Sequence, residues 1–299
     1  MKPVTKITFA DDNGIKFFGE GPCRLLRCVE KTGSLRAAAM EMEMAYSKAS
    51  KLLKQAEENL GFSLTTRSTG GKDGGGSVLT PEGRQFLRQY EAYRDACVEA
   101  NLALYRRYFP QIGCVIMASG LGKRFGGNKL MADFHGQPLI QCALNATEGL
   151  FTKRVVITRH ESVAVLCREQ NLDVVMHNLP HRNDTVRLGL EALGDLDACM
   201  FLPGDQPLLR RETVAMLLQN WKQYPDCMVR PIHEDTEGSP VVFPAWAFPE
   251  LKNLPEGKGG GVVIQKHPHD MIRVSVSDPF ELADADTPQT LELLQQLSR

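Results

Sequence analysis

The spacing of apolar residues divides the chain into a helical part and an alternating part. Between residues 20 and 108, apolar side chains recur every three or four positions, which is typical of amphipathic helices. From Ile112 onward, apolar runs of strand length alternate with segments of helix length. This alternation predicts a mostly parallel, Rossmann-like sheet covered by helices. We therefore expect an α/β protein of two domains, residues 1–110 and 111–299.

Three helices are predicted near the start of the chain, at about residues 22–31, 35–42 and 46–60. Two short, alanine-rich helices followed by a longer one are typical of a helix-turn-helix. A plain three-helix bundle with a basic surface gives the same pattern. The third helix carries hydroxyl and ammonium groups suited to the phosphates and base edges of double-stranded DNA. These candidate DNA-binding residues are Ser47, Lys48, Ser50, Lys51 and Lys54.

A glycine-rich segment, residues 67–80, lies between two β-prone flanks and predicts a hairpin. Next to a helix-turn-helix, this hairpin is expected to be a wing, with Arg67 and Lys72 placed to touch the DNA backbone. A long helix is predicted to follow, over residues 82–108. Its apolar stripe needs a partner, and a second copy of the helix is the most economical one, so a homodimer is expected.

A second glycine-rich segment follows the predicted strand at residues 114–118. It reads M-A-S-G-L-G-K-R-F-G-G-N-K-L over residues 117–130. Backbone N–H groups can approach phosphate oxygens only where side chains are absent, and the cations of the loop neutralise phosphate charge. The loop is not a Walker A motif, because Leu130 follows Lys129, and its glycines do not have the spacing of a dinucleotide fingerprint. It predicts a polyphosphate site.

Aspartates follow two later parts of the predicted sheet. Asp205 comes directly after the strand expected at residues 199–203, and Asp284 and Asp286 precede a helix expected to begin at Pro288. Ligands of open α/β sheets bind at the carboxyl ends of the strands, where carboxylates can hold a cation. A turn or a helix cap would explain each aspartate equally well.

The composition limits the possible locations and partners. No apolar run approaches the roughly 18 residues of a membrane span, and the N-terminus lacks the apolar stretch of a secretory signal, so a cytoplasmic location without a membrane partner is expected. The cysteines and histidines show no zinc-site spacing. Residues 1–110 carry 17 Lys and Arg against 13 Asp and Glu, and residues 111–299 carry 18 against 23. This asymmetry indicates different partners for the two parts.

The wing segment T-G-G-K-D-G-G-G-S-V-L-T, residues 69–80, together with the helix that follows, resembles the DNA-binding domain of the ModE-type molybdate-dependent regulators. These belong with the LysR-type winged helices. The resemblance implies pairing through the long helix and binding of a palindromic DNA site. The molybdate-binding domain of those regulators is not recognisable in residues 111–299, so direct molybdate sensing is not expected.

Residues 112–299 resemble the MobA-like nucleotidyltransferases in five segments that occur in the same order. The family's L-A-[AG]-G-x-S-x-R-M-G-x-x-K matches the glycine loop, and its S-L-R-x-G-L, L-G-D-Q-P-L, G-x-P-V-L-F and D-[IV]-D-T-P match residues 185–190, 202–208, 238–243 and 284–288. Within this superfamily, D-Q-P and D-x-D-T-P favour the molybdenum cofactor cytidylyltransferases over the guanylyltransferases. The pair Ala118-Ser119 departs from the usual pairs of both branches.

The resemblance implies Mg²⁺-dependent transfer of CMP from CTP to a molybdopterin-type cofactor, with release of pyrophosphate. It assigns catalysis to Lys129, Arg124 and Asp205, and Mg²⁺ binding to Asp205 and Asp286, with Asp284 as the alternative second carboxylate. The residues expected to bind the nucleotide are Ala118, Ser119, Gly120, Gly122, Lys123, Arg124, Lys129 and Arg187.

Three departures from the family pattern leave other functions open. Residues 257–261, G-K-G-G-G, replace the family's G-D-x-G-A-R, residues 122–124 lack its serine, and residues 181–183 differ before the S-L-R-x-G-L match. One alternative is a regulator whose nucleotidyltransferase-like domain only senses a nucleotide or a cofactor. Others are a guanylyltransferase that uses GTP, and a nucleotidyltransferase with another phosphorylated acceptor.

Overall fold

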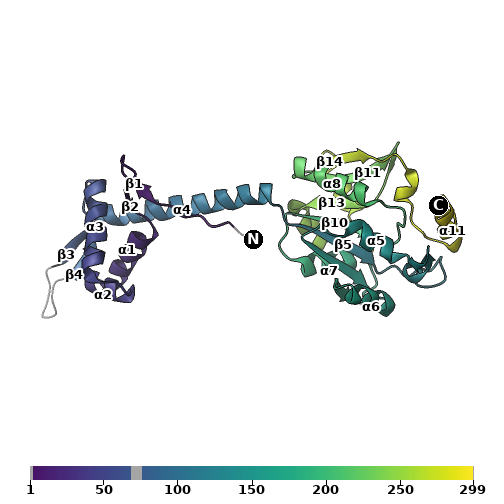
Figure 1. Ribbon diagram of the computed structural model, residues 1–299, viewed down its shortest axis with the longest axis horizontal. Coiled ribbons are helices and arrows are strands. Elements are labelled where there is room, and N and C mark those ends of the chain that lie inside the picture. The colour runs from purple at the N-terminus through teal and green to yellow at the C-terminus, as the bar shows by residue number, and fades with distance from the viewer. Residues whose placement is uncertain (1–2, 69–75, 299) are drawn as a thin grey trace. The chain divides into compact units, whose positions relative to one another are not determined.

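The chain forms two compact units, Met1–Tyr105 and Arg106–Arg299, in the computed structural model (Figure 1). The structure describes residues 3–68 and 76–298. Each unit has a hydrophobic core of its own, as is usual for a domain. No helix in the described parts of the chain is long and apolar enough to cross a membrane.

The first unit contains the predicted helix-turn-helix. Ser34 caps the second helix by accepting a hydrogen bond from the Ala37 N–H, and Gly33, at φ 67°, allows the sharp turn before it. Leu26, Ala38 and Leu53 lie in the shared core of the three helices. The elements of this part are β1 (Phe9–Ala10), β2 (Lys16–Phe18), α1 (Glu20–Thr32), α2 (Leu35–Glu41), α3 (Tyr46–Leu60), β3 (Thr65–Ser68), β4 (Gly76–Leu79) and α4 (Pro81–Tyr108).

The two strands of the predicted wing are present as an antiparallel pair, β3 and β4, in which Thr65 lies opposite Leu79. The Ser77 N–H donates to the Gly33 carbonyl at 2.8 Å, which fixes β4 against the turn between α1 and α2. Residues 69–75, which include the predicted DNA-binding residue Lys72, lie outside the described residues.

Helix α4 is buried at its beginning and exposed further along. Thr80 caps it, with its hydroxyl accepting from the Gly83 N–H at 2.8 Å, and Leu87 and Tyr90 are buried in the core. Beyond them, Tyr93 and Leu104 are 53% and 54% exposed. The helix therefore carries apolar side chains that the described residues of the chain do not cover.

The second unit is built on a mixed sheet in the order β12-β11-β13-β10-β5-β8-β9, with β14 paired to β11. The neighbours β10, β5, β8 and β9 run parallel, and β13 runs antiparallel to β10. The mostly parallel sheet expected from the sequence is therefore confirmed. The strands are β5 (Ile112–Ala118), β8 (Lys153–Thr158), β9 (Asp173–Met176), β10 (Ala198–Pro203), β11 (Met228–His233), β12 (Thr236–Glu237), β13 (Val241–Pro244) and β14 (Met271–Ser275).

Helices cover both faces of this sheet (Figure 1). Alternate residues of β5 face opposite cores: Ile116 packs with α5, α6 and α8, whereas Val115 packs with α7, α9 and α10. A Cβ at Gly189 would lie 2.5 Å from the Val115 side chain, so glycine is what lets α7 approach β5 closely. The helices are α5 (Ile140–Thr147), α6 (Glu161–Glu169), α7 (Arg182–Leu193), α8 (Arg211–Gln223), α9 (Phe248–Lys252) and α10 (Gly261–Lys266).

Near the end of the chain, the sequence predicted a helix correctly but missed a strand. Strand β14, parallel to β11, was not predicted, because its alternating pattern includes the polar Arg273 and Ser275 and offers no long apolar run. Helix α11 (Pro288–Leu297) begins at the expected proline, and the hydroxyl of Thr287 caps it by accepting from the Thr290 N–H at 3.1 Å.

Candidate functional site

A cavity of about 670 Å³ lies where β5, β8 and β10 end. Its wall is formed by the glycine loop after β5, by Asp205 after β10, and by Asp284 and Asp286 before α11. Parallel strands place their carboxyl ends at one edge of the sheet, so residues far apart in the sequence meet there. The cavity therefore contains both the cations and the carboxylates that the sequence analysis singled out.

The glycine loop is fixed by its own backbone and by one histidine. Gly122 has φ 58°, and a Cβ there would lie 1.9 Å from the Gly127 carbonyl oxygen. The Gly122 carbonyl accepts from the N–H groups of Phe125 and Gly126 at 2.9 and 3.0 Å. His160 Nε2 lies 2.8 Å from the Gly120 carbonyl oxygen. The loop thus keeps its shape, and only glycine fits at position 122.

Lys129 lies between two aspartates. Its Nζ forms ion pairs with Asp205 and, at 2.8 Å, with Asp286. Arg124 binds the other oxygen of Asp286 at 2.6 Å. Burial disfavours the charge of Lys129, but the hydrogen bonds and charges of the two aspartates outweigh it and raise its pKa. The hydrogen bond from Lys129 lowers the pKa of Asp286. Lys129 and Asp286 are therefore both charged at neutral pH.

Asp284 has a different environment from Asp286. Burial, followed by the negative charge of Asp205, raises the pKa of Asp284. Gln206 Nε2 donates to Asp284 Oδ1 at 3.0 Å, and the Ala285 N–H donates to the Asp205 carbonyl at 2.9 Å. These bonds attach the segment before α11 to the end of β10. They hold Asp286 close to Asp205.

The carboxylates of Asp205 and Asp286 suit a hard divalent cation whose remaining ligands are supplied by a bound nucleotide and by water. Asp205 and Asp286 both reach the single nitrogen of Lys129. The described part of the chain holds no group of three or more His, Cys, Asp and Glu side chains that could bind a metal by themselves. Mg²⁺ commonly takes one or two carboxylates and completes its shell with phosphate oxygens and water. Such a donor set suits a metal that arrives with a nucleotide.

The structure places most of the predicted nucleotide and metal residues in one cavity and two of them elsewhere. Ala118 is buried within β5. Arg187, on α7, is paired with Glu191 and Asp184 and does not line the cavity. The predicted residues that do line it are Ser119, Gly120, Gly122, Lys123, Arg124, Lys129, Asp205 and Asp286.

Sequence reasoning did not single out the cationic wall residue Arg159, and it noted Arg182 only as part of the departure at residues 181–183. Arg159 comes directly after β8 and Arg182 follows the loop after β9, and neither belongs to a phosphate motif. The position of Arg159 at the carboxyl end of β8, and of Arg182 at the start of the helix after β9, is the signal that could have found them. Arg182 begins α7 and lines a second cavity as well.

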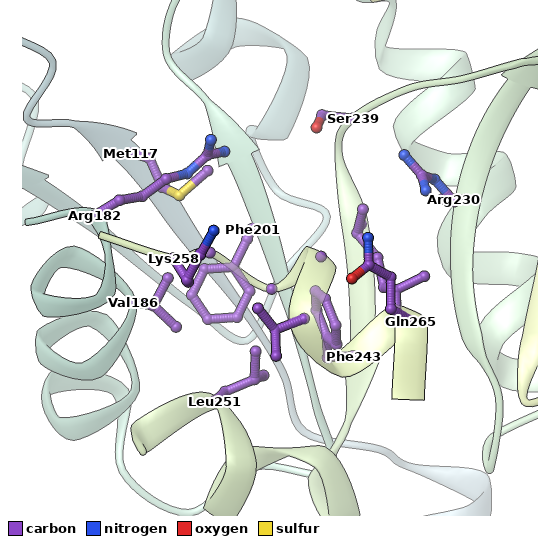
Figure 2. A pocket seen from close by; sticks show the side chains of 16 residues that line it. Met117, Arg182, Val186, Phe201, Arg230, Ser239, Phe243, Leu251, Lys258 and Gln265 are labelled. Atoms are coloured by element: carbon purple, nitrogen blue, oxygen red, sulfur yellow. The ribbon is translucent and has the colours of Figure 1, made fainter. Parts of the chain in front are cut away.

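The second cavity, of about 460 Å³, adjoins the first and shares Met117, Arg182 and Ser239 with it. Figure 2 shows the rings of Phe201 and Phe243 between the side chains that surround them. The cavity thus combines an aromatic and aliphatic floor with cationic side chains. The cations are Arg182, Arg230 and Lys258.

The residue pattern 257–261 is explained by the second cavity. A Cβ at Gly260 would lie 2.7 Å from the Phe243 ring, and a Cβ at Gly259 would lie 3.1 Å from Arg182. The glycines therefore let this loop pack directly against the cavity's aromatic and cationic side chains.

Arg230, another cation of the second cavity, is half-buried, so desolvation lowers its pKa, while Glu237 holds it in an ion pair at 2.5 Å.

Most of the predicted DNA-binding side chains lie on the outer surface of the first unit. Ser47, Lys48, Lys51 and Lys54 of α3 are exposed and Ser50 is partly buried, as is expected of a helix that packs on one face only. Arg67 of β3 is exposed as well. The Arg36 guanidinium lies 6.0 Å from the centre of the Tyr46 ring at the start of α3, a cation–π pair that the sequence did not predict.

Comparison with known families agrees with this arrangement of motifs. Residues 114–271, more than half of the chain, match the family described as the MobA-like NTP transferase domain. The chain belongs to the MobA-like NTP transferases. Residues 23–84 match the bacterial regulatory helix-turn-helix proteins of the LysR family. This MobA-like NTP transferase therefore carries an N-terminal helix-turn-helix, as the two resemblances predicted.

Individual relatives match parts of this MobA-like chain. The molybdenum-pterin-binding protein MopB of Rhodobacter capsulatus is 37% identical over 79 residues, 26% of this chain and 27% of MopB. A probable molybdenum cofactor guanylyltransferase of Aquifex aeolicus is 27% identical over 37% of this chain and 54% of its own length. A 3-deoxy-manno-octulosonate cytidylyltransferase of Helicobacter acinonychis is 34% identical over 33% and 42%. The chain spans about half or less of these relatives.

Solved structures show the same fold for the second unit. Rv0371c of Mycobacterium tuberculosis superimposes with a TM-score of 0.56 at 20% identity, covering 62% of this chain and 98% of that one. A complex of the same mycobacterial protein with manganese gives a TM-score of 0.52 at 19% identity over 62% of this chain and 98% of that one. At such identities the likeness establishes the fold.

Proposed function

We propose that the protein transfers CMP from CTP to a molybdopterin-type cofactor and releases pyrophosphate. The observation that carries this proposal is the pairing of Lys129 with Asp205 and Asp286 at the end of the glycine loop. In the proposed reaction both reactants are anions, so their repulsion must be reduced. A lysine beside a glycine-rich loop, with two carboxylates that could hold a metal ion, can supply the positive charge that this requires. Such a transfer depends on positioning and charge neutralisation more than on a protein nucleophile.

The roles of the loop residues follow from their positions. The N–H groups of Gly120 and Gly122, with Lys123 and Arg124, bind the β- and γ-phosphates. Lys129, which is buried and keeps its charge, binds the α-phosphate and stabilises the negative charge that develops on it. Arg124 and Lys129 exchange their aspartate partners for phosphate oxygens when the nucleotide binds. The exchange frees both carboxylates at the moment when the triphosphate arrives.

Asp205 and Asp286 would hold a divalent cation, Mg²⁺ in this proposal, with Asp284 close by. When bound, the metal neutralises the charge of the triphosphate. The chain's own contribution is to hold the two carboxylates together through the Ala285–Asp205 backbone bond, while Gln206 Nε2 donates to Asp284 and holds that side chain in place.

The second cavity suits the acceptor. A molybdopterin-type acceptor combines a flat heterocycle with a terminal phosphate. Phe201 and Phe243 offer an aromatic floor, and Arg182 at the boundary between the two cavities can direct the acceptor phosphate toward the α-phosphorus. MopB and the Aquifex enzyme, whose names refer to molybdenum pterin and molybdenum cofactor, support this class of acceptor.

The choice of base is argued from the sequence segments that carry the carboxylates. The names of relatives include a guanylyltransferase and cytidylyltransferases. The D-Q-P and D-x-D-T-P segments favour CTP, and GTP is the second candidate. We further propose that the helix-turn-helix binds double-stranded DNA through α3 and the wing, as a homodimer paired through α4.

A direct test incubates the purified protein with Mg²⁺, purified molybdopterin cofactor and each of four α-³²P-labelled nucleoside triphosphates. CTP should give a labelled dinucleotide cofactor together with pyrophosphate, and Asp205→Asn should reduce the rate by about 10²–10³. Near-normal turnover by the Asp205→Asn protein would contradict the assignment. Nucleotide binding without turnover would favour the sensing alternative, in which the second unit reports ligand occupancy to the DNA-binding unit.

A further inference from the structure

Glu281 is a buried carboxylate that the proposed transfer does not use. It lies in the short 3₁₀ helix η3 (Pro279–Leu282), ahead of the aspartates that precede α11, and it is 3% exposed. It does not line the larger cavity. A buried carboxylate costs free energy unless hydrogen bonds replace its contacts with water. The groups that bind Glu281 therefore indicate what this side chain does.

The start of α8 supplies those hydrogen bonds. Oε2 of Glu281 accepts from the Thr213 hydroxyl at 2.5 Å and from the Arg210 N–H at 3.3 Å. Nε of the Arg210 guanidinium lies 3.7 Å from Oε1. Because Arg210 directly precedes α8, the carboxylate also lies at the positive end of the helix dipole. Glu281 thus attaches the segment before α11 to the first turn of α8.

That segment is bonded at two points to the loop between β10 and α8. At the beginning of the loop, the Asp205 carbonyl accepts from the Ala285 N–H at 2.9 Å. At the end of the loop, the Arg210 N–H donates to Glu281. The backbone that carries Asp286 is therefore fixed from both ends of the same loop.

The spacing of the two carboxylates depends on this attachment. Asp205 follows β10, so the sheet holds its backbone, whereas Asp286 lies on a connecting segment whose place is set by its bonds to the loop. Without Glu281, η3 would keep the partly exposed ion pair between Asp278 and Arg210, and such pairs contribute little. The Asp286 carboxylate could then move away from Asp205.

We propose that Glu281 is a positioning residue that holds Asp286 beside Asp205 and so sets the affinity of this site for a divalent cation. The inference rests on the proposed function, in which these two aspartates bind the metal. Loss of the contacts that orient metal ligands typically lowers metal affinity or activity by about 10–100-fold. Because Glu281 acts from a distance through the backbone, we expect an effect at the lower end of this range.

Titration of the full chain with Mn²⁺ in the absence of nucleotide, followed by electron paramagnetic resonance, tests the proposal without requiring any transfer. Glu281→Ala should bind Mn²⁺ about tenfold more weakly than the wild type. Glu281→Gln keeps an oxygen that can accept from the Thr213 hydroxyl and should retain the wild-type affinity. Thr213→Val removes that hydroxyl at similar volume and should weaken binding in the same direction.

A matched control separates positioning from a general loss of stability. Leu217 is buried in the same helix α8 and belongs to the hydrophobic core. Leu217→Ala should lower the melting temperature and leave the Mn²⁺ affinity unchanged. In the transfer assay, Glu281→Ala should raise the Mg²⁺ concentration that gives half the maximal rate by about tenfold, while kcat at saturating Mg²⁺ stays close to that of the wild type.

Thermal unfolding identifies the folded variants, and Thr213→Val decides if Glu281→Ala does not fold. Wild-type Mn²⁺ affinity in the folded variants would overturn the proposal, and so would an equal loss of affinity in Leu217→Ala. Asp286→Asn should also bind Mn²⁺ more weakly. Wild-type affinity in that variant would overturn the proposed metal site and this inference with it. If Mn²⁺ binding met every expectation but no nucleotide gave a labelled product, the proposed transfer would fail and the role of Glu281 would stand.

Discussion

The Lys129 side chain combines burial with a retained positive charge. It is 11% exposed, and the carboxylates of Asp205 and Asp286 supply the partners that water would otherwise provide. A buried ammonium without such partners would lose its proton. The two aspartates therefore maintain a positive charge on Lys129 that is available to a bound triphosphate.

Replacing Lys129 by Met should lower kcat by about 10²–10³, because the charge that develops on the α-phosphate loses its nearest cation. Pyrophosphate release measured with CTP, Mg²⁺ and molybdopterin cofactor checks this. Lys222→Met, an exposed lysine of α8 outside both cavities, is the matched control and should keep its rate. Equal rates in both variants would show that Lys129 has no catalytic role.

The same Lys129→Met substitution should strengthen the binding of metal in the absence of nucleotide. In the wild type, Mn²⁺ must displace the Lys129 ammonium from both aspartates, whereas the variant leaves the carboxylates free. Electron paramagnetic resonance titration with Mn²⁺ should show about tenfold tighter binding in the variant. Unchanged affinity would mean that Asp205 and Asp286 are not the carboxylates that bind the metal.

The shape of the glycine loop after β5 depends on one backbone conformation, at Gly122, that only glycine can adopt without a clash. Gly122→Ala should abolish measurable CTP binding, since the new Cβ would meet the Gly127 carbonyl oxygen at 1.9 Å and force the loop open. Gly127→Ala is the control from the same loop, because a Cβ there meets nothing within 4 Å. Calorimetric titration with CTP compares them. Normal affinity in Gly122→Ala would exclude the loop as the phosphate site.

The sequence was more informative about elements than about the contacts between them. Helix α3, the strands of the wing and the alternation of strands and helices after Ile112 follow from apolar spacing and glycine positions, and the order of motifs placed Lys129 and Asp205 at one edge of the sheet. The contact of Glu281 with Thr213 could not be predicted, because a glutamate in a short connecting segment has no distinguishing pattern. Strand β14 was missed for a related reason, since its pairing with β11 is set by the tertiary structure.

At the scale of the whole molecule, the uncovered stripe of α4 should determine the oligomeric state. Tyr93, Cys97, Ala100 and Leu104 repeat at heptad-like spacing, and Leu104 is 54% exposed. Leu104→Glu should therefore convert a dimer into a monomer in light scattering. Leu102→Glu makes the same substitution on the opposite side of the helix and should remain dimeric. A monomeric wild type would contradict pairing through α4.

Mutation should also separate the DNA binding expected of the first unit from the CMP transfer expected of the second. Lys51→Ala on α3 should weaken binding to double-stranded DNA and reduce the slope of log affinity against log salt by about 0.9, because one phosphate contact is lost. CMP transfer should be unchanged. Fluorescence anisotropy at several salt concentrations measures the slope on DNA from upstream of the protein's own gene. The same slope in the variant and the wild type would show that Lys51 does not touch the DNA backbone.

The ion pair between Arg124 and Asp286 joins residues that are 162 positions apart. Protein synthesis proceeds from the N-terminus at about 5–20 residues per second, and domains fold as units while the chain grows. The helix-turn-helix unit is complete once residue 105 has left the ribosome, whereas the transferase cavity needs residue 286, roughly 10–40 s later at that speed. Every molecule therefore passes through a stage in which its first unit is folded and its second unit has no finished site. Chains whose synthesis stops in this interval would compete for DNA without contributing any catalysis.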